Sequence, residues 1–426
     1  AVILEAAMLL PQLALMGLLI TLGATGARNE MERALNPAML LCFFYALWML
    51  IPQVFVLTAE HPVIGLEHLS PTARAAATLP TQLCLCLFLG AVLIGYAAAL
   101  GLLDGGGHGA RAQPPPLRPA LWVYAVLAYG LGIGAFYLLG RSFHAMPDGT
   151  MRSALVKNPT GQLLMAVSFF GSFGVAYLGA HLWLGGRRLL PIALFLVYGY
   201  LVLQLGARGR ILWPLVTAAM FVWGHRSRIS LSRVLVFAVV GLMLLTLMDP
   251  LVHGLRYDDY ERLREALSPA AMFQTLFYAR NFDGFANLLF ITHNDLIPVQ
   301  PSLLWLGARD VYMETYFPGV YRLGVAFPTT IPGEFWLAGK APLLGAMSLV
   351  YGFALGTLHL YLRHARNESQ VWLYLLLVPW VTSVGGELVE SLNKMIAACL
   401  PALLWIAASW WVPPRDDLHA SRLVGR

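Results

Sequence analysis

Apolar runs long enough to cross a bilayer follow one another along most of this 426-residue chain. A helix that spans the hydrocarbon core needs about 20 mainly apolar residues, and runs of roughly 17–25 residues recur here. Inside a bilayer the backbone must satisfy its own hydrogen bonds, which restricts spanning structures to helices and closed barrels. The runs are continuously apolar rather than alternating, which disfavours a barrel. The sequence therefore predicts an all-α, polytopic integral membrane protein.

Composition supports this class. Hydrophobic residues make up 58% of the chain and charged residues only 12%, against about 25% charged in soluble proteins. The formal net charge of +6 is explained by arginines in short connections between spans, so nucleic acid is not an expected partner. The four cysteines lie inside predicted spans without zinc-site spacing, and we interpret them as small core residues without disulfides: Cys42, Cys84, Cys86 and Cys399.

About eleven spans are expected, the first of them a retained helix without an obvious cleavage site. They cover approximately residues 1–23, 37–59, 76–103, 120–140, 161–184, 189–205, 211–224, 231–248, 341–362, 371–384 and 395–411. The chain then divides into three parts. These are an N-terminal helix bundle (1–248), a long extracytoplasmic segment with amphipathic helices (249–340), and C-terminal helices with a basic tail (341–426).

The distribution of basic residues predicts the orientation of the spans. The connections after spans 1, 3, 5, 7 and 9, together with the tail, hold about 14 lysines and arginines, and the opposite short connections hold about 7. Cytoplasmic loops carry the excess of positive charge. The tail is therefore expected in the cytoplasm, and the segment 249–340 on the other side of the membrane.

This long segment is the expected place of any chemistry. It contains 7 of the chain's 28 basic and 10 of its 22 acidic residues, and no uninterrupted apolar run of spanning length. Acids, arginines and aromatics gathered between membrane helices are typical of functional sites. Its first charged stretch, 253–265 with Arg256, is amphipathic, and the simpler interpretation is an interfacial helix with solvated charges.

Arg208 and Arg210 form the first candidate anion site. They stand one residue apart at a helix break beside Gly206 and Gly209. Fixed cations next to exposed backbone N–H groups suit a phosphate or diphosphate. The simpler alternative is that both side chains extend to lipid headgroups.

Polar residues in the middle of the apolar stretch 272–292 form a second candidate. Arg280 and Asp283 are costly there unless they are paired or face water. A functional pair and a structural i,i+3 ion pair both fit this spacing.

An aromatic and polar group follows, which includes Tyr316, Tyr321 and Arg322. Carbohydrate sites often combine aromatic faces with charged groups, but interfacial belts are aromatic too. Two prolines and a glycine then predict an irregular approach to the next helix over 327–336. Glu334 would lie at the mouth of that helix, where it could orient or deprotonate an acceptor hydroxyl, or cap a helix N-terminus.

Other polar residues receive less weight. Glu387, Glu390 and Lys394 lie near the outer end of the last helices, and His181 and His359 are interpreted as satisfied helix residues. The sequence has no spacing typical of metal ligands and no nucleotide-binding loop, so neither a metal nor a cofactor is expected.

Two motifs carry a resemblance to a known family. The run Pro328-Thr329-Thr330-Ile331-Pro332-Gly333-Glu334-Phe335-Trp336, followed by Gly339, Gly345, Gly352 and Gly356, resembles the C-terminal signature of bacterial oligosaccharide repeat-unit polymerases of the Wzy type. Gly206-Ala207-Arg208-Gly209-Arg210 is similar to that family's glycine-arginine-glycine element. The sequence departs from the family's aromatic-asparagine-aromatic-glycine run, because it reads Phe335-Trp336-Leu337-Ala338-Gly339.

The resemblance implies a reaction. Such enzymes transfer a growing glycan from undecaprenyl diphosphate onto a sugar hydroxyl of another lipid-linked repeat unit, at the periplasmic face of the bacterial inner membrane. A lipid-diphosphate donor mainly needs cations to hold the leaving group. On this basis diphosphate binding is assigned to Arg208, Arg210, Arg256 and Arg322, catalysis to Glu334, Asp283 and Arg280, and a sugar groove to Tyr316, Tyr321 and Trp336. Expected partners are undecaprenyl-diphosphate-linked oligosaccharide, membrane lipids and a polysaccharide chain-length regulator.

Three alternatives stay open. An O-antigen ligase would use the same carrier but transfer the glycan to lipid A-core, with a histidine such as His253 or His293 taking part. A lipid-linked glycan flippase or transporter would have paired discontinuous helices and charges along a central cavity. A structural subunit of an export complex would explain the spans but not the arginines at their outer ends.

Overall fold

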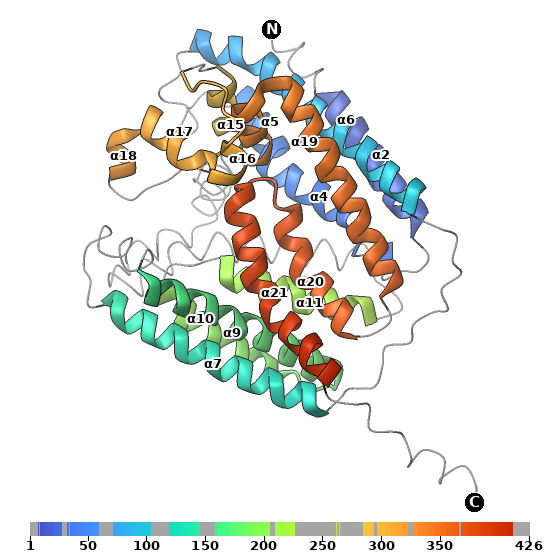
Figure 1. The fold of residues 1–426 in the computed structure, drawn as a ribbon, viewed down its shortest axis with the longest axis vertical. Coiled ribbons are helices and arrows are strands. Elements are labelled where there is room, and N and C mark those ends of the chain that lie inside the picture. The colour runs from blue at the N-terminus through green and yellow to red at the C-terminus, as the bar shows by residue number, and fades with distance from the viewer. Residues whose placement is uncertain are drawn as a thin grey trace, which may run out of the picture.

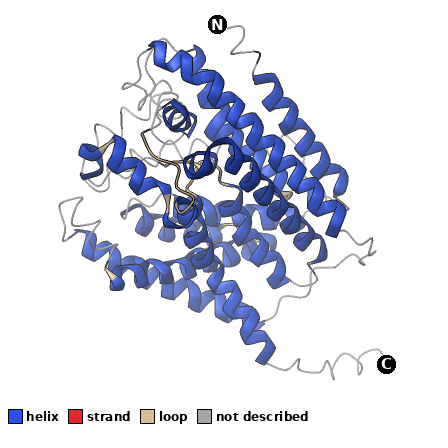
Figure 2. Ribbon diagram, turned by 45° about the horizontal axis from the view of Figure 1, so that its top comes forward, coloured by secondary structure: helices blue, strands red, loops and turns tan. Residues whose placement is uncertain are grey.

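The computed structural model is an assembly of helices (Figures 1 and 2). It describes residues 7, 9–27, 32–33, 35–58, 71–103, 119–144, 158–204, 209–225, 261, 264, 284–293, 296–322, 328–365 and 368–411. Within these ranges there is no strand. Six helices are long and apolar enough to cross a membrane, which makes the chain an α-helical membrane protein: Pro37–Val54, Thr78–Leu103, Leu121–Ser142, Pro159–Leu184, Ile331–His364 and Leu388–Ala407.

The elements follow the predicted spans closely. Before the long segment they are α2 (Leu9–Gly26), α4 (Pro37–Tyr45), the π-helical η1 (Ala46–Leu50), α5 (Ile51–Thr58), α6 (Pro71–Leu103), α7 (Pro119–His144), α9 (Pro159–Leu184), α10 (Leu189–Gln204) and α11 (Gly209–His225). A tight turn joins α9 to α10, and Gly186 there has φ +80°. The span expected at 231–248 lies outside the described residues.

The later elements are short helices followed by three long ones. They are α15 (Gly284–His293), α16 (Leu303–Leu306), α17 (Ala308–Tyr316), α18 (Pro318–Arg322), α19 (Ile331–His364), α20 (Glu368–Thr382) and α21 (Leu388–Trp411). The helix α19 begins ten residues before the predicted span. Thr330 caps it by accepting from the Gly333 N–H, and Pro332 occupies its first turn, where a missing N–H costs nothing. Non-helical dihedrals at Gly339 and Lys340 then break it where the sequence predicted the membrane boundary.

Three hydrophobic clusters hold these helices together. The first is formed mainly by α2, α4, α6, α15, α17 and α19, and the second mainly by α7, α9, α11, α20 and α21. A small third cluster joins α7, α9 and α10. In Figure 1 α7, α9 and α10 lie together, while α2, α6 and α19 lie side by side. Cys42, Cys84 and Cys399 are buried and all four cysteines are free, as predicted.

Glycines let α6 and α19 approach closely, although more than 200 residues separate them in sequence. A Cβ at Gly95 would lie 2.0 Å from the Leu349 carbonyl oxygen, and one at Gly352 would lie 2.1 Å from that of Val92. Small residues at such an interface are typical of membrane helices, since association there depends on close packing. The glycine spacing noted in the sequence thus has a packing role at Gly352.

We expect Gly352→Ala to destabilise the protein by about 1–3 kcal/mol, because the new methyl group would overlap backbone that cannot move aside cheaply. Gly345→Ala on the same helix is the control, since its Cβ would meet Leu87 at an ordinary 3.7 Å. Thermal unfolding in detergent measures both variants. Equal melting temperatures for the two would contradict the close packing.

Candidate functional site

Sequence-predicted site residues fall into two groups. Arg208, Arg256, Arg280 and Asp283 lie outside the described residues, and Arg322 ends α18 without a described side chain. The structure describes the remaining five, which are Arg210, Tyr316, Tyr321, Glu334 and Trp336. Arg210 lies in a pocket among α9, α11, α20 and α21. The other four come from α17, α18 and α19.

Arg210, in the first turn of α11, lines a pocket with aromatic walls. Its Nη1 donates to the Met165 carbonyl oxygen at 3.2 Å and to the Ser168 hydroxyl. The guanidinium carbon lies 4.2 Å from the centre of the Phe169 ring, a cation–π contact. The walls of this pocket include Trp213 and Trp380.

A guanidinium beside aromatic rings is a combination that can contact phosphate oxygens and the faces of sugar rings. Both hydrogen bonds of Arg210 come from one nitrogen, and a guanidinium has five N–H donors in a planar fork that matches phosphate oxygens. The rings of Trp213 and Trp380 lie 5.5 Å apart and provide flat apolar faces. The structure therefore places a cation expected to bind an anion against aromatic surface.

Five charged residues meet where α17, α19 and α21 come together; we call them the charged cluster: Arg309, Asp310, Glu387, Glu390 and Lys394. The Arg309 Nη1 donates to Glu390 Oε2 at 2.9 Å, and its Nε lies 3.5 Å from carboxylate oxygens of Glu387 and Asp310. Lys394 pairs with Glu390 one turn away on α21. These residues come from two stretches of the sequence, one before α19 and one after it, and the fold joins them.

Glu334 is a buried neighbour of the charged cluster. Its side chain is fully buried, and its Oε2 accepts from the Leu388 N–H at 2.7 Å. Leu388 is the first residue of α21, so Glu334 caps a neighbouring helix at its positive end. Its Oε1 accepts from the Thr329 hydroxyl at 3.5 Å. Of the two interpretations given to Glu334 from the sequence, this geometry fits helix capping.

The predicted sugar-groove residues have different surroundings. Burial and the neighbouring Asp310 carboxylate raise the pKa of the Tyr321 hydroxyl, which places Tyr321 beside the charged cluster. The Tyr316 hydroxyl accepts from the Leu296 N–H at 3.2 Å, and its ring packs edge-on against Phe290 at 5.1 Å. Trp336, in the second turn of α19, packs against the first hydrophobic cluster, and the Lys340 ammonium lies 5.9 Å from its ring centre. Tyr321 is the member of this group with a contact to the charged cluster.

Proton affinities differ sharply within the cluster. Burial raises the pKa of the Glu387 carboxyl to about 8, against the opposing effect of Arg309 and with smaller contributions from neighbouring carboxylates. Burial disfavours the Arg309 guanidinium, but Glu387 and Glu390 raise its pKa above the ordinary value. A buried carboxyl that ionises near neutral pH is therefore held beside a permanent cation.

Stability should depend on the ionisation of Glu387. Its folded pKa of about 8 exceeds the ordinary value of 4.5, so the folded state holds a proton that the unfolded chain releases between these values. This contribution to stability is fully present below pH 4.5 and is lost as pH rises to 8. We expect Glu387→Gln to reduce that slope and raise the melting temperature at pH 8, measured in detergent. Superimposable curves of melting temperature against pH would contradict the assignment.

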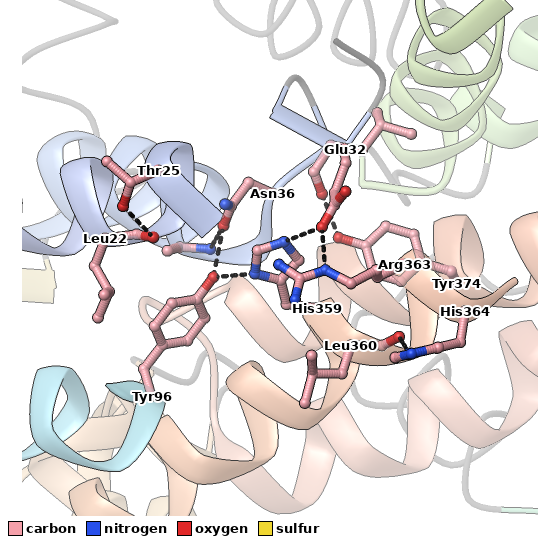
Figure 3. Close-up of polar contacts among 12 residues, drawn as sticks. Leu22, Thr25, Glu32, Asn36, Tyr96, His359, Leu360, Arg363, His364 and Tyr374 are labelled. Atoms are coloured by element: carbon pink, nitrogen blue, oxygen red, sulfur yellow. Dashed lines mark hydrogen bonds and ion pairs between the residues drawn. The ribbon is translucent and has the colours of Figure 1, made fainter. Parts of the chain in front are cut away.

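A second polar network lies near the C-terminal end of α19, where side chains of α6 and α19 meet residues that precede α4 (Figure 3). His359 is fully buried; its Nε2 lies 3.0 Å from Glu32 Oε1 and its Nδ1 lies 2.5 Å from the Tyr96 hydroxyl. The Arg363 Nε donates to the same Glu32 oxygen at 2.7 Å, and the Tyr96 hydroxyl donates to Asn36 Oδ1 at 3.1 Å. The expectation that His359 is a satisfied helix residue is confirmed. Glu32 and Arg363 were missed, although an acid and a base flanking predicted spans were the available signal.

His181 is also satisfied, as predicted. Its Nε2 lies 2.6 Å from Glu368 Oε1, which also accepts from the Trp372 indole N–H at 3.2 Å. We call this end of the bundle, with Glu32, His359 and His181, the network end, and the opposite end, with Arg210 and the charged cluster, the cluster end. Among the described residues no three histidine, cysteine or acidic side chains are grouped to hold a metal ion.

The helical fold, together with the polar groups at the network end and the cluster end, defines an α-helical membrane protein with ionisable groups at both ends of its bundle. Comparison with known proteins adds no family to this class: no family model, curated protein or solved structure matches the chain.

Proposed function

We propose that this protein is a membrane glycosyltransferase that polymerises undecaprenyl-diphosphate-linked oligosaccharide repeat units at the periplasmic face of the bacterial inner membrane. The observation that carries the proposal is the position of Arg210 in an aromatic-walled pocket of the helix bundle. Negative charge develops on the lipid diphosphate as it leaves the sugar, and a cation at the membrane interface is needed to stabilise that charge. The sugar attached to it needs flat apolar surface and hydrogen-bonding groups.

Charge at the bundle ends supports the periplasmic orientation. The helices α2, α6, α9 and α19 end at the network end, and the sequences that follow them include Arg28, Arg111, Arg187, Arg188 and Arg366. An excess of arginine marks cytoplasmic connections. The pocket and the charged cluster then face the periplasm, where completed repeat units are available. The helix α20 connects the pocket with the beginning of α19. Its Trp380 lines the pocket, and the Val384 carbonyl, two residues after the end of α20, accepts a hydrogen bond from the Ile331 N–H.

A reconstitution experiment tests the function. Purified protein in nanodiscs receives lipid-linked repeat units extracted from the cells that make it, without nucleotide sugar or added divalent metal. A ladder of products on a gel is the expected result. No ladder, but transfer to added lipid A-core, would establish a ligase in its place, and His293 at the exposed end of α15 would then become a candidate.

A lipid-linked glycan transporter is the second candidate. Two observations favour it: the buried ionisable groups of the network end, and two interrupted helices, the π-helical η1 after α4 and the break at Gly339 and Lys340 in α19. Discontinuous helices and buried charges are frequent in transporters. Movement of the lipid-linked glycan across sealed vesicles, without any ladder, would establish transport and overturn the polymerase.

A further inference from the structure

One carboxylate oxygen in the charged cluster has no hydrogen-bond partner although it is buried. Glu387 is 5% exposed, and its Oε1 accepts no hydrogen bond. Its neighbours differ. Both oxygens of Glu390 are engaged, one by Arg309 and one by Lys394, and both oxygens of Glu334 accept bonds from Leu388 and Thr329. A buried acceptor without a partner costs roughly 1–3 kcal/mol of stability, so such a group points to a ligand.

A donor without a partner lies next to it. The Arg309 Nε makes no hydrogen bond, and it lies 3.5 Å from both Glu387 Oε1 and Asp310 Oδ1. One hydroxyl group would satisfy both atoms, because its oxygen accepts from Nε while its hydrogen is donated to Oε1. The pair is therefore complementary to an alcohol.

The fold holds both side chains in place. Gly385, two residues before Glu387, packs so closely on Trp48 that a Cβ there would lie 2.1 Å from the indole ring. The Glu387 carbonyl accepts from the Ser391 N–H at 2.8 Å, which ties it to the first turn of α21. The guanidinium of Arg309 is fixed by its 2.9 Å bond to Glu390. The free acceptor and donor are thus preorganised before any ligand binds.

We propose that Glu387 and Arg309 bind the acceptor sugar hydroxyl and that Glu387 is the general base of the glycosyl transfer. This inference rests on the proposed function. The hydroxyl oxygen attacks the anomeric carbon of the donor and forms the new glycosidic bond. The bond from that carbon to the diphosphate oxygen breaks, and undecaprenyl diphosphate leaves with the electron pair. The hydroxyl proton passes to Glu387 Oε1 and is then released to water, while Arg309 orients the attacking oxygen.

The base must be ionised to act, which predicts a pH dependence. Its carboxyl faces Arg309 and Asp310 from α17, Glu334 from α19, and Glu390, itself paired with Lys394, from α21. Burial among these groups places its pKa near neutrality, where a general base works best. Transfer should therefore slow as pH falls from 8 to 6.

The test compares Glu387→Gln with Glu314→Gln, an exposed acidic position on α17, the helix that carries Arg309. In the ladder assay we expect Glu387→Gln to slow polymerisation by at least about 100-fold, with the residual activity independent of pH. Binding of undecaprenyl diphosphate should stay within twofold of wild type, and Glu314→Gln should match wild type throughout. Glu387→Asp should restore part of the rate.

The outcomes separate this inference from the proposed function. A ladder from Glu387→Gln at the wild-type rate would overturn the role of Glu387 and leave the polymerase intact. Loss of undecaprenyl diphosphate binding together with the ladder would show that Glu387 maintains the fold, which also overturns its role as base. No ladder from the wild-type protein would overturn the proposed function itself.

Discussion

Replacement of Arg363 by methionine is expected to lower the free energy of unfolding by about 3–5 kcal/mol, one of the two largest effects that the structure predicts. Arg363 bonds to Glu32 at 2.7 Å, and the two side chains are 3% and 2% exposed. Without the guanidinium, the buried carboxylate of Glu32 would lose a permanently charged partner. Unfolding in mixed micelles with increasing SDS measures the loss.

The double variant Glu32→Gln with Arg363→Met shows whether charge causes that loss. Removing both ends of a buried ion pair costs much less than removing one, because no uncompensated charge is left. Most of the stability should therefore return. His364→Gln is the control, since that exposed neighbour bonds only within its own helix, at the Leu360 carbonyl. A double variant as unstable as Arg363→Met would indicate lost packing instead.

Replacement of Arg210 by alanine is expected to slow polymerisation by about 100- to 1000-fold, the usual effect of removing a preorganised group that stabilises transition-state charge. Arg210→Lys should recover only part of this rate, because an ammonium lacks the planar fork that holds two phosphate oxygens. The ladder assay measures the rate, and equilibrium binding of undecaprenyl diphosphate tests the assigned ligand.

Arg210 also bonds to Met165 and Ser168, so structural damage has to be excluded. The matched control is Arg187→Ala, an exposed arginine in the turn at the network end. Melting temperatures of both variants should lie close to wild type. The groups that lose their bond to Arg210, the Met165 carbonyl and the Ser168 hydroxyl, are uncharged, so no buried charge is left without a partner. Wild-type polymerisation and wild-type diphosphate binding by Arg210→Ala would refute this use of the pocket.

Helix positions could be predicted because apolar runs and glycine–proline connections are local features. The predicted boundaries of α9, α10 and α11 lie within two residues of the observed ones. The start of α19 was missed by ten residues, because prolines suggested an irregular approach. In the fold Pro332 lies in a first helical turn, which needs no N–H from it.

Side-chain roles were harder to predict, because they depend on contacts across the sequence. Glu334 was recognised as a residue at a helix mouth, but its partner is the N-terminus of α21, 54 residues later. Glu387 was given little weight because its unsatisfied oxygen is visible only when Arg309 is placed beside it. The Glu32–Arg363 pair joins residues 331 positions apart. No periodic pattern encodes such pairings.

The close packing of α6 against α19 has a consequence for biosynthesis. A ribosome adds roughly 5–20 residues per second, so α19 emerges roughly 10–50 s after α6 is complete. During that time the glycine face of α6, whose native neighbour has not yet been made, is open to lipid or to another helix. Correct assembly therefore requires that any early partner of this face be displaced by α19. A substitution at Gly95 or its neighbours that strengthens binding to such a partner would leave the protein misassembled before its last three helices are inserted.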